Sequence, residues 1–214
     1  MAKRILVRAD DIGYCRGINY GIADSIWNGI IRSAGVMPNM PEAQHGVDLL
    51  KGSGVCFGQH TNLCLGKPCA DPARIPSLLD ENGNLKSSRT YREAWKRGEE
   101  ITKLDEMVIE IEAQYHRYLE LVGEKPHYFE AHAVMNHNLS KGLAIVAEKY
   151  DLPYLPPVLS RPAPRSAAIR SSPAWTAWHP AMTRLPACKR RRWQSMAATN
   201  VRCSYAIRGT STII

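Results

Sequence analysis

The feature that most constrains the fold of this chain is a short apolar run that ends in two adjacent acids, residues 5–13 (ILVRADDIG). A run of this length bounded by glycine is typical of a buried strand, with Asp10 and Asp11 at its carboxyl end. Adjacent carboxylates that leave water together repel each other, so a metal ion or a substrate amine commonly lies beside them. The alternative interpretation is that one of the acids caps a helix expected over residues 14–29.

Strand and helix patterns alternate along the first three quarters of the chain. Ile18, Ile22 and Ile26 recur at helical spacing, which indicates an amphipathic helix that packs on a sheet. The same reasoning predicts strands at 33–37, 54–65 and 127–138 and helices at 41–51, 93–122 and 140–150. This alternation is typical of an α/β fold with a parallel sheet. The long segment 66–92, rich in Pro, Gly, Asn and Ser, is typical of a lid or substrate loop.

The net charge of +8 is not spread evenly over the chain. Residues 1–157 contain 18 basic and 20 acidic residues, whereas residues 158–214 contain 10 basic residues, no acid and three of the five tryptophans. A nearly neutral body does not favour nucleic-acid binding by the whole chain. The predicted domains are therefore an α/β domain over 1–157 and a basic Pro/Arg/Ala/Ser-rich tail over 158–214.

Two interpretations of the tail are open. Residues 189–192 (KRRR) beside Trp193 could pair phosphates and stack a base, as a natural nucleic-acid-binding tail would. Translation of a GC-rich gene in the wrong frame would also yield Arg, Ala, Pro, Ser, Trp and Cys with few acids. The many tryptophans and the lack of any acid favour the frame shift.

The cysteines and the hydropathy of the chain indicate the cellular compartment. The six cysteines form no C-x-x-C pair and no regular framework, which indicates reduced thiols rather than disulfides or a four-cysteine zinc site. No run of about 18 apolar residues is present, and the first residues, MAKRILVRADD, lack the hydrophobic region of a signal peptide. We therefore expect a soluble, cytoplasmic protein with no membrane partner.

Three of the predicted strands end in side chains that bind metal ions, namely Asp10 and Asp11, His60, and His132. The carboxyl ends of parallel strands meet at one edge of a sheet, so these side chains should lie together. One carboxylate and two imidazoles leave positions for water and substrate on Zn²⁺, Mn²⁺, Fe²⁺ or Mg²⁺. The second carboxylate, whose side chain should diverge from its neighbour along the strand, is left as a base.

Each histidine alone is weak support for a site, because a single strand histidine is more often a hydrogen-bonded core residue. The set of acids and histidines is more informative than its members. We expect the remaining histidines, His137 among them, on the surface or in loops, although His137 is close enough to His132 to line the same site.

Three segments resemble the motifs of the YdjC-like carbohydrate deacetylases, the chitooligosaccharide deacetylase family. Residues 8–22 (RADDIGYCRGINYGI) resemble its opening Asp-Asp motif, which is followed by glycine and a helix that carries Asn. Residues 58–68 (GQHTNLCLGKP) resemble its Gly-x-His-x-Asn-Leu segment. Residues 128–139 (YFEAHAVMNHNL) resemble its third motif of an acid, a small residue and a histidine. The resemblance covers residues 4–157.

Carried over by position, the resemblance implies that Asp11, His60 and His132 are metal ligands and that Asp10 is the general base. It also implies a (β/α) barrel-like fold, a divalent cation with Mg²⁺ favoured and Zn²⁺ as the alternative, acetylated oligosaccharides as substrates, and a homodimer. The implied function is that of a metal-dependent hydrolase that deacetylates N-acetylated carbohydrates.

The chain departs from the family pattern in two places. Ala133 and Val134 stand where many members carry a histidine or another polar residue. Beyond Pro157 nothing resembles the late His-Pro-Gly-like segment, because the similar residues 178–181 (WHPA) lie in the basic tail. We therefore expect a barrel that is incomplete at its C-terminus. The alternatives to an active deacetylase are an inactive or truncated sugar-binding homologue and a nucleic-acid-binding protein that acts through its tail.

Overall fold

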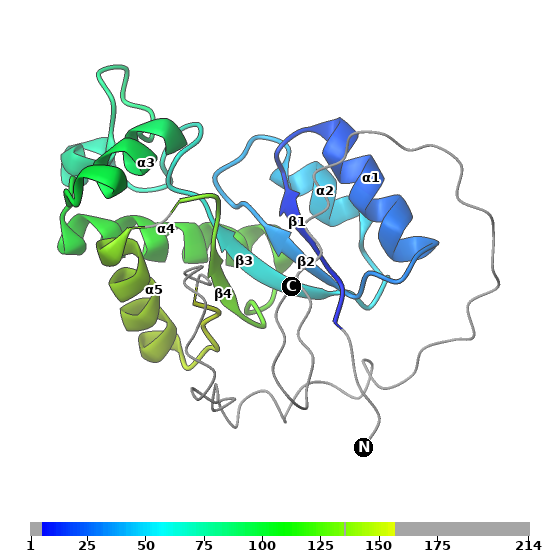
Figure 1. The fold of residues 1–214 in the computed structure, drawn as a ribbon. Helices are drawn as coiled ribbons and strands as arrows, with labels where there is room; N and C mark the ends of the chain where they lie inside the picture. The colour runs from blue at the N-terminus through cyan, green and yellow to red at the C-terminus, as the bar shows by residue number, and fades with distance from the viewer. Residues whose placement is uncertain (1–5, 135, 157–214) are drawn as a thin grey trace, which may run out of the picture.

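A computed structural model describes residues 6–134 and 136–156 of the chain (Figure 1). Strands and helices alternate in it, with two short 3₁₀ turns in the long connection after the third strand. The elements are β1 Arg8–Ile12, α1 Arg16–Trp27, β2 Ser33–Val36, α2 Ala43–Leu49, β3 Cys56–Thr61, η1 Pro72–Arg74, η2 Pro76–Leu78, α3 Ser88–Arg97, α4 Leu104–Val122, β4 Phe129–Ala131 and α5 His137–Tyr150.

The strands form one parallel sheet in the order β1-β2-β3-β4. Their carboxyl ends lie at the upper edge of the sheet in Figure 1. Beyond α5 the chain returns to the outer side of β4, where Tyr154 forms a parallel bridge with Phe129. The α/β prediction is confirmed, and within the described residues the sheet is open rather than closed into a barrel.

One face of the sheet packs against the helices. Ala9, Val36 and Phe57 lie in a cluster with apolar side chains of α1 and α2, and Phe129 lies in a second cluster with side chains of α4 and α5. Phe129 is fully buried, and burial of such a side chain stabilises the folded state by about 1.5–3 kcal/mol relative to leaving it exposed. The helical periodicity in the sequence located most of this apolar layer, but Ile30 and Ile145, which share that spacing, are exposed.

The opposite face of the sheet carries polar and charged side chains. Arg8 on β1, His60 on β3 and Glu130 on β4 alternate with the apolar residues and so lie on this face. Gly58 also belongs to it, and a Cβ there would lie 2.1 Å from the Tyr128 ring. The lack of a side chain at this position lets the tyrosine lie across the sheet beside the charged residues.

The predicted helix over 93–122 is wrong, because two helices occupy that region. α3 ends at Gly98, which has a φ of 71°, and this left-handed conformation favours glycine. The linker to α4 is held by the Glu100 carboxylate, which accepts hydrogen bonds from Thr102 and Asn136. The side chain of Asn136 also accepts a hydrogen bond from the backbone N–H of Leu139 and so caps α5. The helix therefore begins at His137, three residues earlier than predicted.

None of the helices within the described ranges is long and apolar enough to cross a lipid bilayer. The four cysteines in these ranges, Cys15, Cys56, Cys64 and Cys69, are free thiols. The boundary predicted at residue 157, the basic tail and the proposed frame shift lie outside the described residues.

Candidate metal centre

The acid pair lies where β1 departs from regular strand pairing. Ala9 pairs with Ala34 and Ile12 pairs with Val36, so Asp10 and Asp11 together face a single residue of β2. This is a β-bulge, and Asp11 has a φ of 76°, a left-handed conformation that residues other than glycine rarely adopt. Backbone strain of this kind persists where the surrounding structure holds it, commonly at functional sites.

The bulge decides where the two carboxylates point. A regular strand would send neighbouring side chains to opposite faces, as the sequence analysis expected. Instead both acids approach His60, Asp11 in one group with His132 and Asp10 in another with Glu130. The two acids therefore belong to one connected cluster on the polar face of the sheet.

Asp11, His60 and His132 bring three ligand atoms to one point. Asp11 Oδ1 lies 3.1 Å from His60 Nε2 and 3.0 Å from His132 Nδ1, and the two ring nitrogens are 3.0 Å apart. Adjacent ligand atoms on an octahedral ion, each about 2.1 Å from it, are also about 3.0 Å apart. The residues present thus fit a divalent cation in donor chemistry and in spacing.

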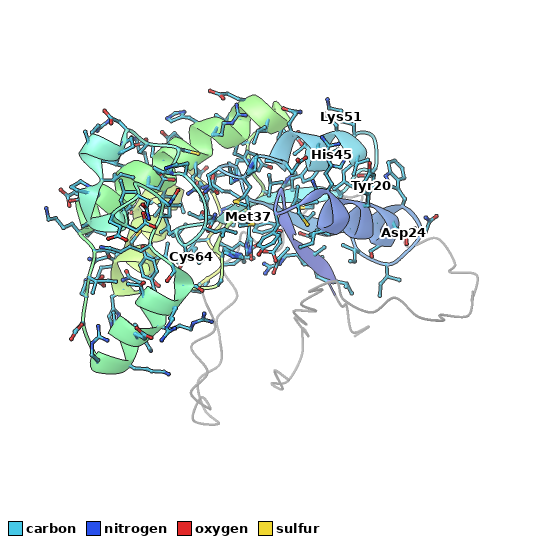
Figure 2. The ribbon with its side chains drawn as sticks, turned by 90° about the horizontal axis from the view of Figure 1, so that it is seen from above. Tyr20, Asp24, Met37, His45, Lys51 and Cys64 are labelled. Atoms are coloured by element: carbon cyan, nitrogen blue, oxygen red, sulfur yellow. The ribbon has the colours of Figure 1, made fainter. Side chains whose placement is uncertain are left out.

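The three side chains come from the carboxyl ends of three strands, as predicted. Asp11 belongs to β1, His60 to β3, and His132 follows β4, where its backbone N–H donates to Thr61. Figure 2 is a view from above, onto this edge of the sheet, and shows Met37 near its centre, just after β2. Parallel pairing therefore gathers residues that lie up to 121 positions apart in the chain into one site.

The group of Asp11, His60 and His132, called the trio below, favours the charged forms of Asp11 and His60. Burial would raise the pKa of the Asp11 carboxyl, but hydrogen bonds and charge from His132 and His60 hold that pKa well below its usual range. Burial likewise lowers the pKa of His60, yet the charge of Glu130 and the contact with Asp11 raise it to about 10. When no cation is bound, a protonated His60 partly neutralises the negative charge of the neighbouring acids.

Asp10 has a different set of partners. Its Oδ1 lies 2.7 Å from Arg8 Nε, and its Oδ2 accepts a hydrogen bond of 3.1 Å from Arg8 Nη2. Arg8 also forms an ion pair through Nη1 with Glu130 Oε2. The guanidinium thus joins the two acids and orients the Asp10 carboxylate beside the candidate ligands.

Neither acid caps the first helix, so the capping alternative is wrong. The residue at the start of α1 is Cys15, whose side chain makes no capping hydrogen bond. The turn after β1 is held instead by buried Asn19, whose Oδ1 accepts from the backbone N–H of Gly13 and whose Nδ2 donates to Glu42. The Asn of the opening motif therefore fixes the strand-to-helix turn that carries the acids.

Of the other histidines within the described residues, His137 and His45 have partners outside the group of Asp11, His60 and His132. His137 packs its ring 4.9 Å from that of Trp95 and lines a separate cavity of about 340 Å³ with Tyr91 and Glu100. His137 is exposed, as expected for a surface histidine, and no contact joins it to the metal site among the described residues. His45 contacts the helix residues of α1 rather than a strand end.

Sequence reasoning missed two members of the cluster, Arg8 and Glu130. Both stand two positions before a predicted site residue, Arg8 before Asp10 and Glu130 before His132. That spacing places each pair on the same face of its strand. The signal was therefore present as strand alternation, but it was not used.

The sequence model of the YdjC-like proteins matches residues 4–209. This match covers most of the chain. The chain belongs to the YdjC-like family. Its match extends past residue 157, where the motif resemblance ended.

Curated YdjC-like relatives carry deacetylase names. A carbohydrate deacetylase of Geobacillus stearothermophilus is 36% identical over 166 residues, which cover 76% of this chain and 63% of the relative. A chitooligosaccharide deacetylase of Yersinia pestis is 34% identical over 134 residues, 62% of this chain and 50% of the relative. The chain thus spans half to under two thirds of the length of these relatives.

A solved structure agrees with the YdjC-like fold. The crystal structure of a candidate cellobiose-phosphate cleavage protein from Enterococcus faecalis V583 superposes with a TM-score of 0.62 and 26% sequence identity. The match covers 70% of this chain and 57% of that protein. The α/β architecture of the described residues is therefore shared with a longer chain.

Proposed function

We propose that this YdjC-like chain is a metal-dependent hydrolase that removes acetyl groups from N-acetylated carbohydrates. The observation that carries the proposal is the convergence of Asp11 Oδ1, His60 Nε2 and His132 Nδ1 within 3.1 Å of one another. The names of the curated relatives supply the substrate class. Acetylated oligosaccharides and a homodimer complete the proposal on the strength of the family resemblance.

The three side chains would hold the cation, and Asp10 would act as the base. A bound cation would polarise the amide carbonyl and lower the pKa of water. Asp10 would accept the proton of the attacking water, since Arg8 fixes its carboxylate beside the ligands. Mg²⁺ is the ion that the resemblance favours, although a set with two imidazoles also suits Zn²⁺ or Mn²⁺.

Acetate release from an acetylated chitooligosaccharide tests the proposal. The protein is treated with a chelator and assayed with Mg²⁺, Mn²⁺ or Zn²⁺ restored in turn. We expect release that requires one of these ions and that disappears in His60→Ala and His132→Ala. Release that persists in the chelated protein, or in both variants, would contradict it.

The two alternative functions give different results in the same preparation. An inactive sugar-binding homologue would bind the oligosaccharide without releasing acetate. A nucleic-acid-binding tail would give polynucleotide affinity that falls steeply with salt, because phosphate contacts release counterions.

A further inference from the structure

Glu130 lies between the candidate ligand His60 and the buried arginine Arg8. It stands on β4 directly opposite His60 on β3 in the register of the sheet. Its Oε1 lies 3.3 Å from His60 Nδ1, the ring nitrogen that does not face the metal site. Its Oε2 is ion-paired with Arg8 Nη1. Each carboxylate oxygen of Glu130 therefore has one distinct neighbour.

The contact between His60 and Glu130 is isolated from other groups. His60 Nδ1 and Glu130 Oε1 are both buried, and neither makes a hydrogen bond within residues 6–134 and 136–156; their contact is the 3.3 Å ion-pair distance between them. A buried ring nitrogen and a buried carboxylate oxygen without other partners each carry a free-energy cost that only their mutual contact relieves. The arrangement thus favours a proton on Nδ1, shared with the carboxylate.

β2 makes room for this pair. A Cβ at Gly35 would lie 2.8 Å from Glu130 Oε1 and 3.0 Å from His60 Cβ. A residue larger than glycine would therefore push the carboxylate or the imidazole out of place. The absence of a side chain at this position is an independent sign that the pair is built into the sheet.

We infer that Glu130 is a positioning residue that keeps the proton of His60 on Nδ1, so that the Nε2 lone pair points at Asp11 and His132. This inference rests on the proposed metal site. A neutral imidazole carries its proton on one nitrogen only, and a carboxylate at Nδ1 selects the tautomer whose Nε2 can bind a cation. Arg8 holds the second oxygen of Glu130 and thereby fixes the direction of the first.

The second group of metal-binding side chains, Asp10, His60 and Glu130, does not require a cation of its own. The guanidinium of Arg8 already contacts both carboxylates of that group. A metal ion there would have to displace a buried arginine that is paired on two sides. We therefore assign one cation to the cluster, at the trio that contains Asp11.

Replacing Glu130 by Gln tests the inference sharply, because Arg8 has only donors. The amide oxygen of the new side chain should turn to Arg8, which leaves the amide NH₂ facing His60 Nδ1. That arrangement favours the tautomer with the proton on Nε2, where it competes with the cation. Glu130→Asp keeps a carboxylate and should keep the proton on Nδ1.

The experiment measures Zn²⁺ affinity by competition with a chromophoric chelator, together with the ¹⁵N NMR signals of the histidine rings. We expect Glu130→Gln to weaken Zn²⁺ binding about 10–100-fold and, in the Zn²⁺-loaded protein, to lose the signal of a His60 Nδ1–H that is hydrogen bonded to a carboxylate. Glu130→Asp should retain that signal and most of the affinity. Glu148→Gln, an exposed change on α5, is the matched control and should alter neither.

Three results would overturn the inference. The first is a Glu130→Gln variant whose Zn²⁺ affinity and whose His60 Nδ1–H signal in the Zn²⁺-loaded protein are both unchanged. The second is equal loss in the Gln and Asp variants, which would indicate a packing role for Glu130. The third is two Zn²⁺ ions per chain in the parent protein, which would assign Glu130 as a ligand. All three are read without acetate release, so a protein that binds Zn²⁺ through His60 but lacks deacetylase activity would contradict only the proposed function.

Discussion

Two polar clusters in this molecule differ in how their acids are satisfied. On α4, Glu110 is fully buried, and its carboxylate accepts the backbone N–H groups of Cys69 and Ala70 and the side-chain amide of Gln114. On the sheet, Asp11 instead faces two imidazoles that approach it and each other.

The difference separates a structural acid, Glu110, from a candidate metal ligand, Asp11. Backbone N–H groups are fixed donors, so a carboxylate that they satisfy holds a loop in place, here the connection that follows β3. Imidazole nitrogens can each be a donor or an acceptor, and two of them converging with a carboxylate oxygen on one point can hold a cation. Glu110 is also more deeply buried than Asp11 and His132, which are partly exposed, but the chemistry of the partners is what separates the two clusters.

Removal of a ligand imidazole should have the largest effect. We expect His60→Ala and His132→Ala each to weaken binding of a divalent cation by more than about 100-fold, since a three-ligand site has no redundancy. Metal content after dialysis and the dissociation constant for Zn²⁺ measure this. His137→Ala, outside the trio, should bind normally. If both variants bind as much metal per chain as the parent protein, the cluster on the sheet is not a metal site and does not differ from the α4 cluster in this respect.

Asp10 should affect rate rather than metal binding. Asp10→Asn is expected to keep the cation while lowering kcat for acetate release by about 10²–10⁴-fold, as for loss of a general base. The measurement compares kcat with metal content in the same preparation. If the variant is metal-free, Asp10 shares the ligand role with Asp11, and the assignment of Asp10 as base and Asp11 as ligand is wrong.

Metal binding should release a proton from the cluster. The pKa of His60, raised to about 10 in the metal-free protein, means that the ring is protonated at neutral pH. A cation binds only the neutral imidazole, so its affinity should fall as pH falls, by about tenfold per pH unit between about pH 6 and pH 8. Calorimetry in two buffers with different ionisation enthalpies measures the released proton. Binding without proton release would show that His60 is not a ligand.

A mutation in the α4 cluster should change the stability of the protein but not its metal affinity, and this is the smallest expected effect. Glu110→Gln replaces an acceptor by an amide NH₂ beside backbone N–H donors that need an acceptor. We expect the free energy of unfolding to fall by about 1–3 kcal/mol, with Zn²⁺ affinity unchanged. Urea denaturation and the chelator competition provide the two readings. A loss of Zn²⁺ affinity in this variant would mean that the two clusters are coupled.

Strand and helix periodicity alone located most of the fold. Ile22 and Ile26 recur at helical spacing and lie buried on α1, and the apolar run with His60 became β3. These predictions succeeded because burial of an apolar face imposes a local period on the chain. The single helix over 93–122 was a failure of the same method, because Gly98 and the linker to α4 interrupt the helix without interrupting its apolar pattern.

The sequence by itself also determined which strand ends carry the candidate metal ligands, and parallel pairing places those ends at one edge of the sheet. Only the tertiary structure decided how those side chains face each other. The bulge at Asp10 and Asp11 turns both acids to one side, and the pairing of β3 with β4 sets Glu130 against His60. Arg8 then joins acids from β1 and β4, the two outer strands of the described sheet. Such contacts depend on register and on backbone conformation at single residues, which the sequence encodes only through the whole fold.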